Sequence, residues 1–214
     1  MRSALCTPLL LCCACIMSPG SDAQYTFYFS SQEFDGGTLP VPYGEQVNVE
    51  VMVQDENGDF VLINPFLISW TAADPDILEV SSFDGHAAIK GKKDWFDVLP
   101  PGADAGAGHE PATDLIVDYR GSTGVIRVVV VINAQDTWSI RADDDPAQEV
   151  KFKQDGRTVR HEIFDYEGSI DGNAFIFSGF GYDLTGAFVN RDRTEGTYIN
   201  NNKGTAGPWV GDRL

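Results

Sequence analysis

The sequence predicts an all-β protein, with a β-sandwich followed by a small antiparallel β-barrel or meander. Residues 46–54 alternate between Val and mainly polar side chains, as a strand with one buried face does. No stretch longer than about a dozen residues shows the 3.6-residue apolar period of an amphipathic helix. Turn-forming residues recur at the spacing of roughly 8–12 residues that is typical of sandwiches. Together, these three observations predict the fold class.

The composition limits the kinds of partner. The chain has 214 residues, of which 43% are hydrophobic, so it can build one large packed domain or two small ones. Its 15 Lys and Arg against 32 Asp and Glu give a formal net charge of −17. Such a charge argues against binding nucleic acid or an anionic membrane. We therefore expect no nucleic-acid partner.

Residues 1–23 have the organisation of a signal peptide. Arg2 precedes an apolar segment at residues 4–16, and Ser21-Asp22-Ala23 offers small residues for cleavage. The apolar segment is shorter than the roughly 20 residues of a transmembrane helix, and no later stretch is long enough. We expect an exported protein without a transmembrane span, located outside the cell, in a periplasm or on the cell surface.

All four cysteines, Cys6, Cys12, Cys13 and Cys15, lie in this signal peptide. Cleavage after Ala23 would leave no disulfide, so the core alone would have to stabilise the fold. The alternative is lipoprotein processing with a lipid anchor through Cys13 or Cys15, because the Leu-rich segment suits either pathway.

An N-terminal segment at residues 24–37 is expected to lead into a sandwich at residues 38–133. Asn57-Gly58 predicts a hairpin turn, and the valines after residue 125 predict a buried final strand. The strands expected in this part of the chain are residues 25–29, 46–54, 60–63, 67–71, 77–80, 87–90, 115–119 and 125–132.

Five features between residues 39 and 132 occur in an order shared with a known family: Gly44, Asn57-Gly58, Trp70, Asp74-Pro75 and the valines at residues 125–131. In this order they resemble the bacterial Ig-like domain of the invasin and intimin kind. The resemblance implies that Trp70 packs in the core between two sheets. The alternative role for Trp70 is an exposed platform for stacking a sugar.

The chain departs from that family at residues 94–112, where the family has a short turn. The Pro- and Gly-rich composition predicts a long loop, and long loops in compact domains are often functional. Lys92 and Lys93 stand beside Trp95 and Phe96, whose rings would point opposite ways in extended backbone. Cationic and aromatic groups together favour a binding hot spot, so we predict a partner contact at these four residues. One alternative is that Trp95 or Phe96 packs down as an anchor for the loop, since aromatic residues are usually buried. Another is that the insertion covers a sheet edge.

Residues 134–214 predict the second β unit. Its Gly-rich rhythm, with Trp138 near the start and Trp209 and Arg213 near the end, resembles small lipocalin-like barrels of secreted bacterial proteins. Such a barrel can hold a small ligand or fill its interior with side chains. The residues expected to line a cavity, or to form ordinary core, are Phe175, Phe177, Phe188 and Tyr198.

The expected mature sequence contains no recognisable catalytic or metal motif. His86, His109 and His161 are scattered, and no His-Glu-x-x-His, Cys-x-x-Cys or Gly-x-Ser-x-Gly motif occurs. Asp143-Asp144-Asp145 offers oxygen ligands that suit calcium but lacks EF-hand spacing, so a solvated acidic turn is the alternative. We predict no cofactor and assign no catalytic residue.

These observations predict an exported, non-enzymatic bacterial surface or secreted protein. The expected role is adhesion, partner binding or domain spacing, with a protein or carbohydrate partner at the cell surface. One alternative is a small-ligand carrier that uses the C-terminal barrel. A second alternative is a hydrolase accessory subunit or an enzyme of unknown type.

Overall fold

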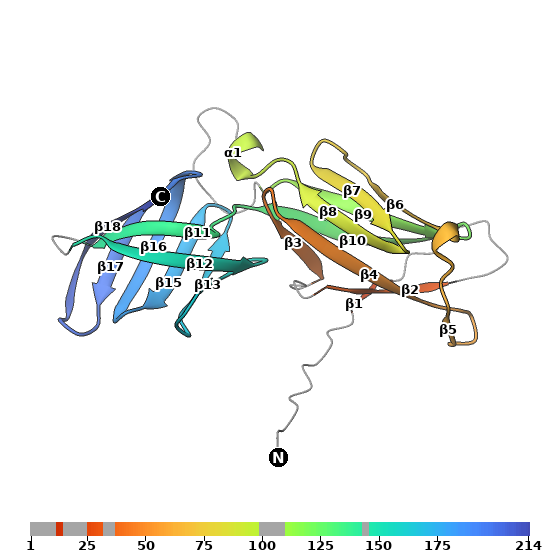
Figure 1. The fold of residues 1–214 in the computed structure, drawn as a ribbon, viewed down its shortest axis with the longest axis horizontal. Helices are drawn as coiled ribbons and strands as arrows, with labels where there is room; N and C mark the ends of the chain where they lie inside the picture. The colour runs from red at the N-terminus through yellow and green to blue at the C-terminus, as the bar shows by residue number, and fades with distance from the viewer. Residues whose placement is uncertain (1–11, 15–24, 32–36, 99–109, 143–145) are drawn as a thin grey trace, which may run out of the picture.

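The computed structural model describes residues 12–14, 25–31, 37–98, 110–142 and 146–214. These residues form two facing sheets and a closed barrel, with one short α-helix and one 3-10 turn (Figure 1). The prediction of an all-β fold with a terminal antiparallel barrel is confirmed.

The first sheet is built around β4 (Gln46–Gln54), whose alternating valines are buried as its sequence predicts. Its strand order is β1 (Cys12–Ala14), β2 (Thr26–Ser30), β4, β8 (His86–Gly91) and β7 (Leu78–Phe83), with β5 (Phe60–Val61) pairing to β4. Strand β1 lies within the expected signal peptide and pairs antiparallel with β2. The rest of that peptide, including Cys15, lies outside the described residues.

The second sheet covers the opposite side of the core. Its strand order is β3 (Thr38–Pro42), β10 (Ser122–Val131), β9 (Ala112–Tyr119) and β6 (Ile68–Ala72), and β3 runs parallel to β10. Trp70 on β6 is buried and meets Phe29 of the first sheet edge to face, with 6.2 Å between ring centroids. Trp70 therefore lies in the core, as expected, and is not an exposed sugar platform.

Eight antiparallel strands close the barrel: β11 (Asp136–Ala142), β12 (Gln148–Asp155), β13 (Thr158–His161), β14 (Glu167–Asp171), β15 (Ala174–Gly179), β16 (Tyr182–Asn190), β17 (Arg193–Asn200) and β18 (Thr205–Arg213). Each strand pairs with the next one in sequence, and β18 pairs back to β11. Gly186 and Gly196 face each other on β16 and β17. A Cβ on Gly196 would lie 2.0 Å from the carbonyl oxygen of Thr185, so only glycine fits there.

The junction between sandwich and barrel is fixed by polar contacts. Asn133 donates from its Nδ2 to the Tyr43 carbonyl at 3.0 Å. Gln154 of the barrel donates to the Ile132 carbonyl at 2.9 Å and accepts from the backbone N–H of Ala134 at 2.6 Å. Because these bonds join both sides, the two parts are held together as one elongated molecule (Figure 1).

Candidate interaction surface

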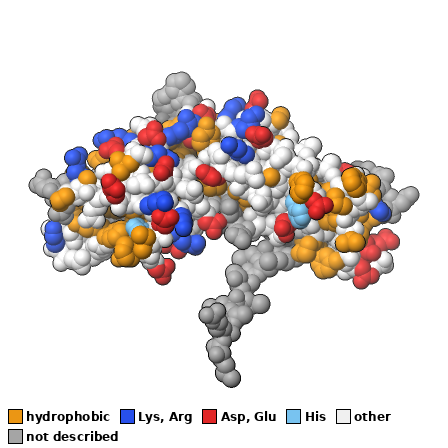
Figure 2. Space-filling view, in the orientation of Figure 1, with side chains coloured by type: hydrophobic (Ala, Val, Ile, Leu, Met, Phe, Trp, Pro, Cys, Tyr) orange, Lys and Arg blue, Asp and Glu red, His pale blue; other side chains and the backbone are white. Residues whose placement is uncertain are grey.

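Large apolar side chains gather on the surface at the end of the sandwich that carries β5 (Figure 2). They come from β5, from the segment after it, from the 3-10 turn η1 (Pro65–Leu67) and from β7: Phe60, Leu62, Phe66, Leu67 and Phe83. Leu62 and Phe66 are 96% and 95% exposed. Exposed apolar residues that occur singly need no explanation, whereas a group of them marks an interaction site. We call this surface the apolar end.

Side-chain caps hold two of the exposed turns of the apolar end in place. The Oδ1 atom of Asn64 accepts a hydrogen bond from the Phe66 backbone N–H at 3.1 Å, which caps η1. In the turn before β5, Asp55 Oδ1 accepts from the backbone N–H groups of Asn57 and Asp59, at 2.9 and 3.0 Å. Such caps satisfy backbone donors that would otherwise be left to solvent. The exposed residues therefore sit on defined turns.

The turn of the β7–β8 hairpin is held in place by a hydrogen bond from a core residue. Its turn residues Asp84 and Gly85 have φ of 49° and 84°, the left-handed region that a two-residue hairpin turn requires. The Nε1 of Trp70 donates to the Gly85 carbonyl at 3.1 Å. The buried indole thus fixes the hairpin that presents Phe83 to solvent.

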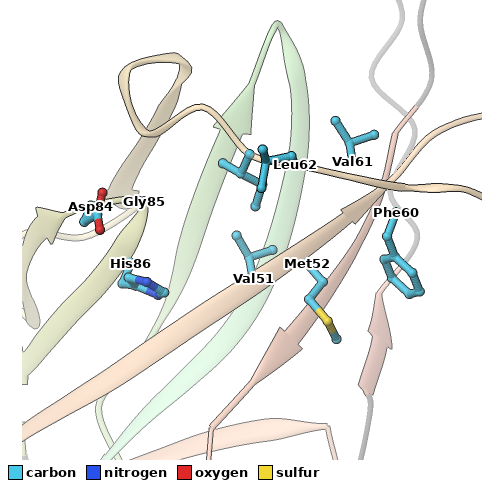
Figure 3. A pocket seen from close by; sticks show the side chains of 9 residues that line it. Val51, Met52, Phe60, Val61, Leu62, Asp84, Gly85 and His86 are labelled. Atoms are coloured by element: carbon cyan, nitrogen blue, oxygen red, sulfur yellow. The ribbon is translucent and has the colours of Figure 1, made fainter.

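A hollow of about 270 Å³ opens between β5 and the start of β8 (Figure 3). It arises because β8 pairs with β4 only as far as Val49, and β5 pairs with β4 only from Val53. Between these points, Val51 and Met52 lie along the hollow instead of facing a neighbouring strand on that side. Its lining residues are Val51, Met52, Phe60, Val61, Leu62, Ile63, Asp84, Gly85 and His86.

A second hollow, of about 470 Å³, adjoins the first at the hairpin turn. Both are lined by Asp84 and Gly85, and the second is also bordered by Phe66 and Phe83. The exposed aromatic residues therefore surround a continuous, indented surface. Its polar side chains are Ser82, Asp84 and His86, and His86 approaches Glu50 of β4 within 3.9 Å.

Of the four predicted contact residues, the structure places Trp95 and Phe96 against the barrel, whereas Lys92 contacts the sandwich. Trp95 and Phe96 begin the short helix α1 (Trp95–Val98), so the expectation of extended backbone with opposed rings is wrong. Their rings meet edge to face with centroids 5.2 Å apart. Trp95 is only 3% exposed and belongs to the buried cluster of the barrel, so its indole is not open to a partner.

The two lysines do not join the apolar end. Lys92 is exposed and donates from Nζ to the Pro75 carbonyl at 2.8 Å, and Lys93 is half-buried. Residues 99–109 of the predicted loop lie outside the described part of the chain. At residue 110 the chain contacts the barrel again, where Glu110 pairs with Arg157 and accepts from the Gly172 backbone N–H at 2.9 Å. Both flanks of the loop are therefore anchored within the molecule.

A buried carboxylate secures α1 to the barrel. The Asp94 side chain is 1% exposed and receives two hydrogen bonds from Arg191, at 2.8 and 2.9 Å. Arg191 also pairs with Asp97 at 2.7 Å and lies over the Tyr43 ring, 4.8 Å from its centroid. The two carboxylates raise the pKa of Arg191. Burial acts to raise the pKa of Asp97, but hydrogen bonds from Arg191 and the Asp94 backbone N–H outweigh it and lower that pKa.

The lowered pKa of Asp97 predicts a loss of stability in acid. A carboxylate with a lower pKa in the folded state adds stability above its unfolded pKa, which is near 3.8 for Asp, and that stability disappears as pH falls through the folded pKa. Asp97→Asn should therefore lower the melting temperature at neutral pH. The difference in melting temperature between this variant and the wild type should shrink below about pH 4. Thermal melts across this interval measure the effect. In an Arg191→Met background, the pH dependence of the Asp97→Asn effect should be clearly smaller, with only the hydrogen bond from the Asp94 backbone N–H left to lower the pKa of Asp97. An undiminished pH dependence would mean that Arg191 is not the partner that matters.

The four predicted cavity residues fill the barrel instead of lining an open chamber. Phe175, Phe177, Phe188 and Tyr198 are all buried, and Phe175 meets Phe188 edge to face with centroids 5.8 Å apart. A cavity of about 40 Å³ lies beside Phe177, which is far below the 300 Å³ or more of a typical ligand pocket. Among the described residues, these side chains occupy the interior in which a carried ligand was expected. The predicted aromatic and basic closure does occur, since Arg213 lies over the Trp138 ring at 5.0 Å.

Two further predictions fall on parts of the chain that the structure does not describe. The calcium candidates Asp143, Asp144 and Asp145 lie outside the described residues, as does the proposed lipid-anchor site Cys15. For Cys13, only the backbone pairing in β1 is described. Within the described ranges, no group of three His, Cys, Asp or Glu side chains is arranged to hold a metal ion.

A second exposed apolar group lies on the barrel after β13, at Ile163 and Phe164. Here the backbone N–H groups of both residues donate to His161 Nδ1, at 3.0 and 3.1 Å. The Phe164 ring also packs on Tyr166 and Phe180, with centroids 5.6 Å from each. This group is covered in part by its own aromatic neighbours.

Sequence reasoning missed the apolar end because it assigned residues 60–63 to a strand that continued the sheet. The strand ends at Val61, and Pro65 soon after it cannot donate a ladder hydrogen bond. Leu62, Phe66 and Leu67 therefore flank a break where no strand can bury them. Large apolar residues on both sides of an Asn-Pro step are the signal that would have identified the surface.

Comparisons with known proteins identify no family for this chain. A scan against protein-family models and a search of curated proteins found no match. Among solved structures, domains 5-6 of the S-layer protein SbsC share 13% identity at a TM-score of 0.35, covering 84% of this chain and 81% of that chain. Two longer structures of the surface layer protein SbsC each share 14% identity at a TM-score of 0.35. The match to domains 4-9 covers 86% of this chain and 26% of that chain, and the match to domains 1-6 covers 88% and 23%.

Within the described residues, no helix has the length and apolarity to cross a membrane.

Proposed function

We propose that the protein is an exported, non-enzymatic binding module that contacts another protein at or outside the cell surface through its apolar end. The main support for this proposal is a group of exposed apolar side chains around one indented surface: Phe60, Leu62, Phe66, Leu67 and Phe83. Burying such side chains contributes about 25 cal/mol per Å² of apolar area, so their exposure in the free protein leaves binding energy available to a partner. Export is proposed from the signal-peptide pattern at residues 1–23.

The rest of the molecule supports a role in adhesion or spacing. The hydrogen bonds of Asn133 and Gln154 and the ion pair of Arg191 with Asp94 fix the barrel against the sandwich. The apolar end and the barrel lie at opposite ends of the long axis (Figure 1). The barrel thus forms a stiff spacer, which places the apolar end at a distance from the opposite end of the molecule.

Site-specific photo-crosslinking in the cells that make the protein tests this function. A photoreactive phenylalanine replaces Leu62 at the apolar end, and Ile199, a 54% exposed apolar residue of the barrel, is the control position. We expect a discrete crosslinked product from position 62 and not from position 199. Adding Phe66→Asp should reduce that product about tenfold or more, because central aromatic contacts carry a large share of interface energy. Equal products from both positions, or indifference to Phe66→Asp, would show that the apolar end is not the binding surface.

A further inference from the structure

The charge around the apolar end restricts the chemistry of its partner. Residues 46–89, from the start of β4 to the fourth residue of β8, contain eight Asp and Glu residues and no Lys or Arg. Lys90 of β8 pairs with Gln46, at the end of β4 away from the hollow. Asp55, Glu56 and Asp59 occupy the turn next to Phe60, and Asp84 lies between the two hollows. In the neighbouring β9–β10 turn, Arg120 already lies over the Tyr119 ring, at 5.4 Å. The surface therefore combines an apolar centre with an acidic rim.

This rim selects against two alternative occupants. A second copy docked through the same face would bring the acidic rims together, and like charges across an interface are unfavourable. An anionic lipid surface would meet the same repulsion, since membrane attraction depends on basic residues. A cationic rim on the partner would instead be complementary, and it would steer the encounter.

The hollow restricts the shape of the partner. Its floor is the stretch of β4 around Val51 and Met52 between the ends of two pairing strands, so it is short and bounded on both sides. A bounded apolar hollow of about 270 Å³ receives a few side chains and not a whole domain face. The turns that present Phe66 and Phe83 are already held by Asn64 and by Trp70, so little ordering is needed on binding.

We infer that the apolar end binds a protein segment in which a large apolar side chain is flanked by Lys or Arg residues. The apolar side chain enters the hollow beside β4, and the flanking cations face Asp55, Glu56, Asp59 and Asp84. This inference rests on the proposed function and specifies its partner class.

Selection from random peptides displayed on phage tests the inference. The full protein is the bait, and a Leu62→Asp variant removes peptides that bind elsewhere. We expect the enriched peptides to carry an aromatic or Leu residue with Lys or Arg within a few positions. Synthetic copies are then measured by fluorescence anisotropy at low and high salt, against the wild type and a neutralised variant, Glu56→Gln/Asp59→Asn/Asp84→Asn. Each of its changes preserves side-chain size, and Asn tolerates the left-handed backbone of residue 84.

The result expected is a loss of about tenfold in affinity for the neutralised variant, from three exposed charge pairs of modest strength each, together with a weaker salt dependence. Selected peptides that need Leu62 but lack cations, and bind the neutralised variant equally well, would overturn the inference while leaving the apolar end as a binding surface. Peptides that bind the wild type and Leu62→Asp equally, or no Leu62-dependent peptide at all, would overturn both proposals.

Discussion

Replacing Trp95 with Ala is expected to lower the free energy of unfolding by about 3–5 kcal/mol, as for other buried aromatic residues truncated to Ala. The indole is buried in the aromatic cluster of the barrel although it belongs to α1, on the sandwich side of the junction. Its removal leaves a cavity at the barrel, and α1 is then held there mainly by the ion pairs of Arg191 with Asp94 and Asp97. For a chain of this size the melting temperature should fall by about 10 °C.

A matched variant separates packing from polarity at this position. Trp95 Nε1 is buried without a hydrogen-bond partner among the described residues, and an unsatisfied buried donor costs about 1–3 kcal/mol. Trp95→Phe removes this donor and keeps most of the apolar bulk, so its stability should lie within about 1 kcal/mol of the wild type. If Trp95→Ala melts at the wild-type temperature in calorimetry, α1 does not pack on the barrel in solution.

Replacing Arg191 with Met should lower the free energy of unfolding by about 3 kcal/mol. Asp94 is almost completely buried, and removing its partner leaves an unpaired carboxylate in a protein interior, which typically costs 3–5 kcal/mol. We place the value at the low end, about 3 kcal/mol, because Arg191 itself is 40% exposed and solvent screens part of the interaction. Chemical denaturation, with the midpoint and slope compared to the wild type, measures the loss.

Arg193→Met is the control for this substitution. Arg193 lies two positions further along and pairs with Glu195 and Asp212, whose side chains are about half exposed. Exposed pairs of this kind contribute about 0–1 kcal/mol. Equal effects of the two substitutions would mean that burial of Asp94 does not govern the stability of the junction.

Most of the fold could be predicted from the alternation of apolar and polar residues. The predictions that failed concern residues whose environment is set by distant parts of the chain. The alternation in β4 and the Asn57-Gly58 turn are local signals, so their strands could be recognised without knowing the neighbours. The environment of Trp95 is not local. Its burial depends on the barrel, whose strands begin at residue 136. A reading of residues 92–96 alone could not distinguish an exposed aromatic from one that packs against a distant part of the chain.

The predicted sites also divide into features with a local sequence signal and features set by distant parts of the chain. The residues of the barrel interior could be identified from their alternation, but whether they leave a cavity depends on how eight strands close, which no single strand encodes. The apolar end depends on the point where β8 stops pairing with β4, and that point is set by the β7–β8 turn. The exposure of Leu62 and Phe66, in contrast, follows from the local break at Asn64-Pro65, which the sequence does contain.

The pairing of β18 with both β11 and β17 imposes an order on the synthesis of the protein. Trp138, at the beginning of the barrel, pairs with Arg213, so the ring closes only when β18 has been made. The sheets of the sandwich are complete at Val131, well before that point. During this interval β11 and β17 are open strand edges above an unfinished aromatic interior, a combination that promotes aggregation. A chain interrupted before residue 205 should therefore aggregate readily even though its sandwich is whole.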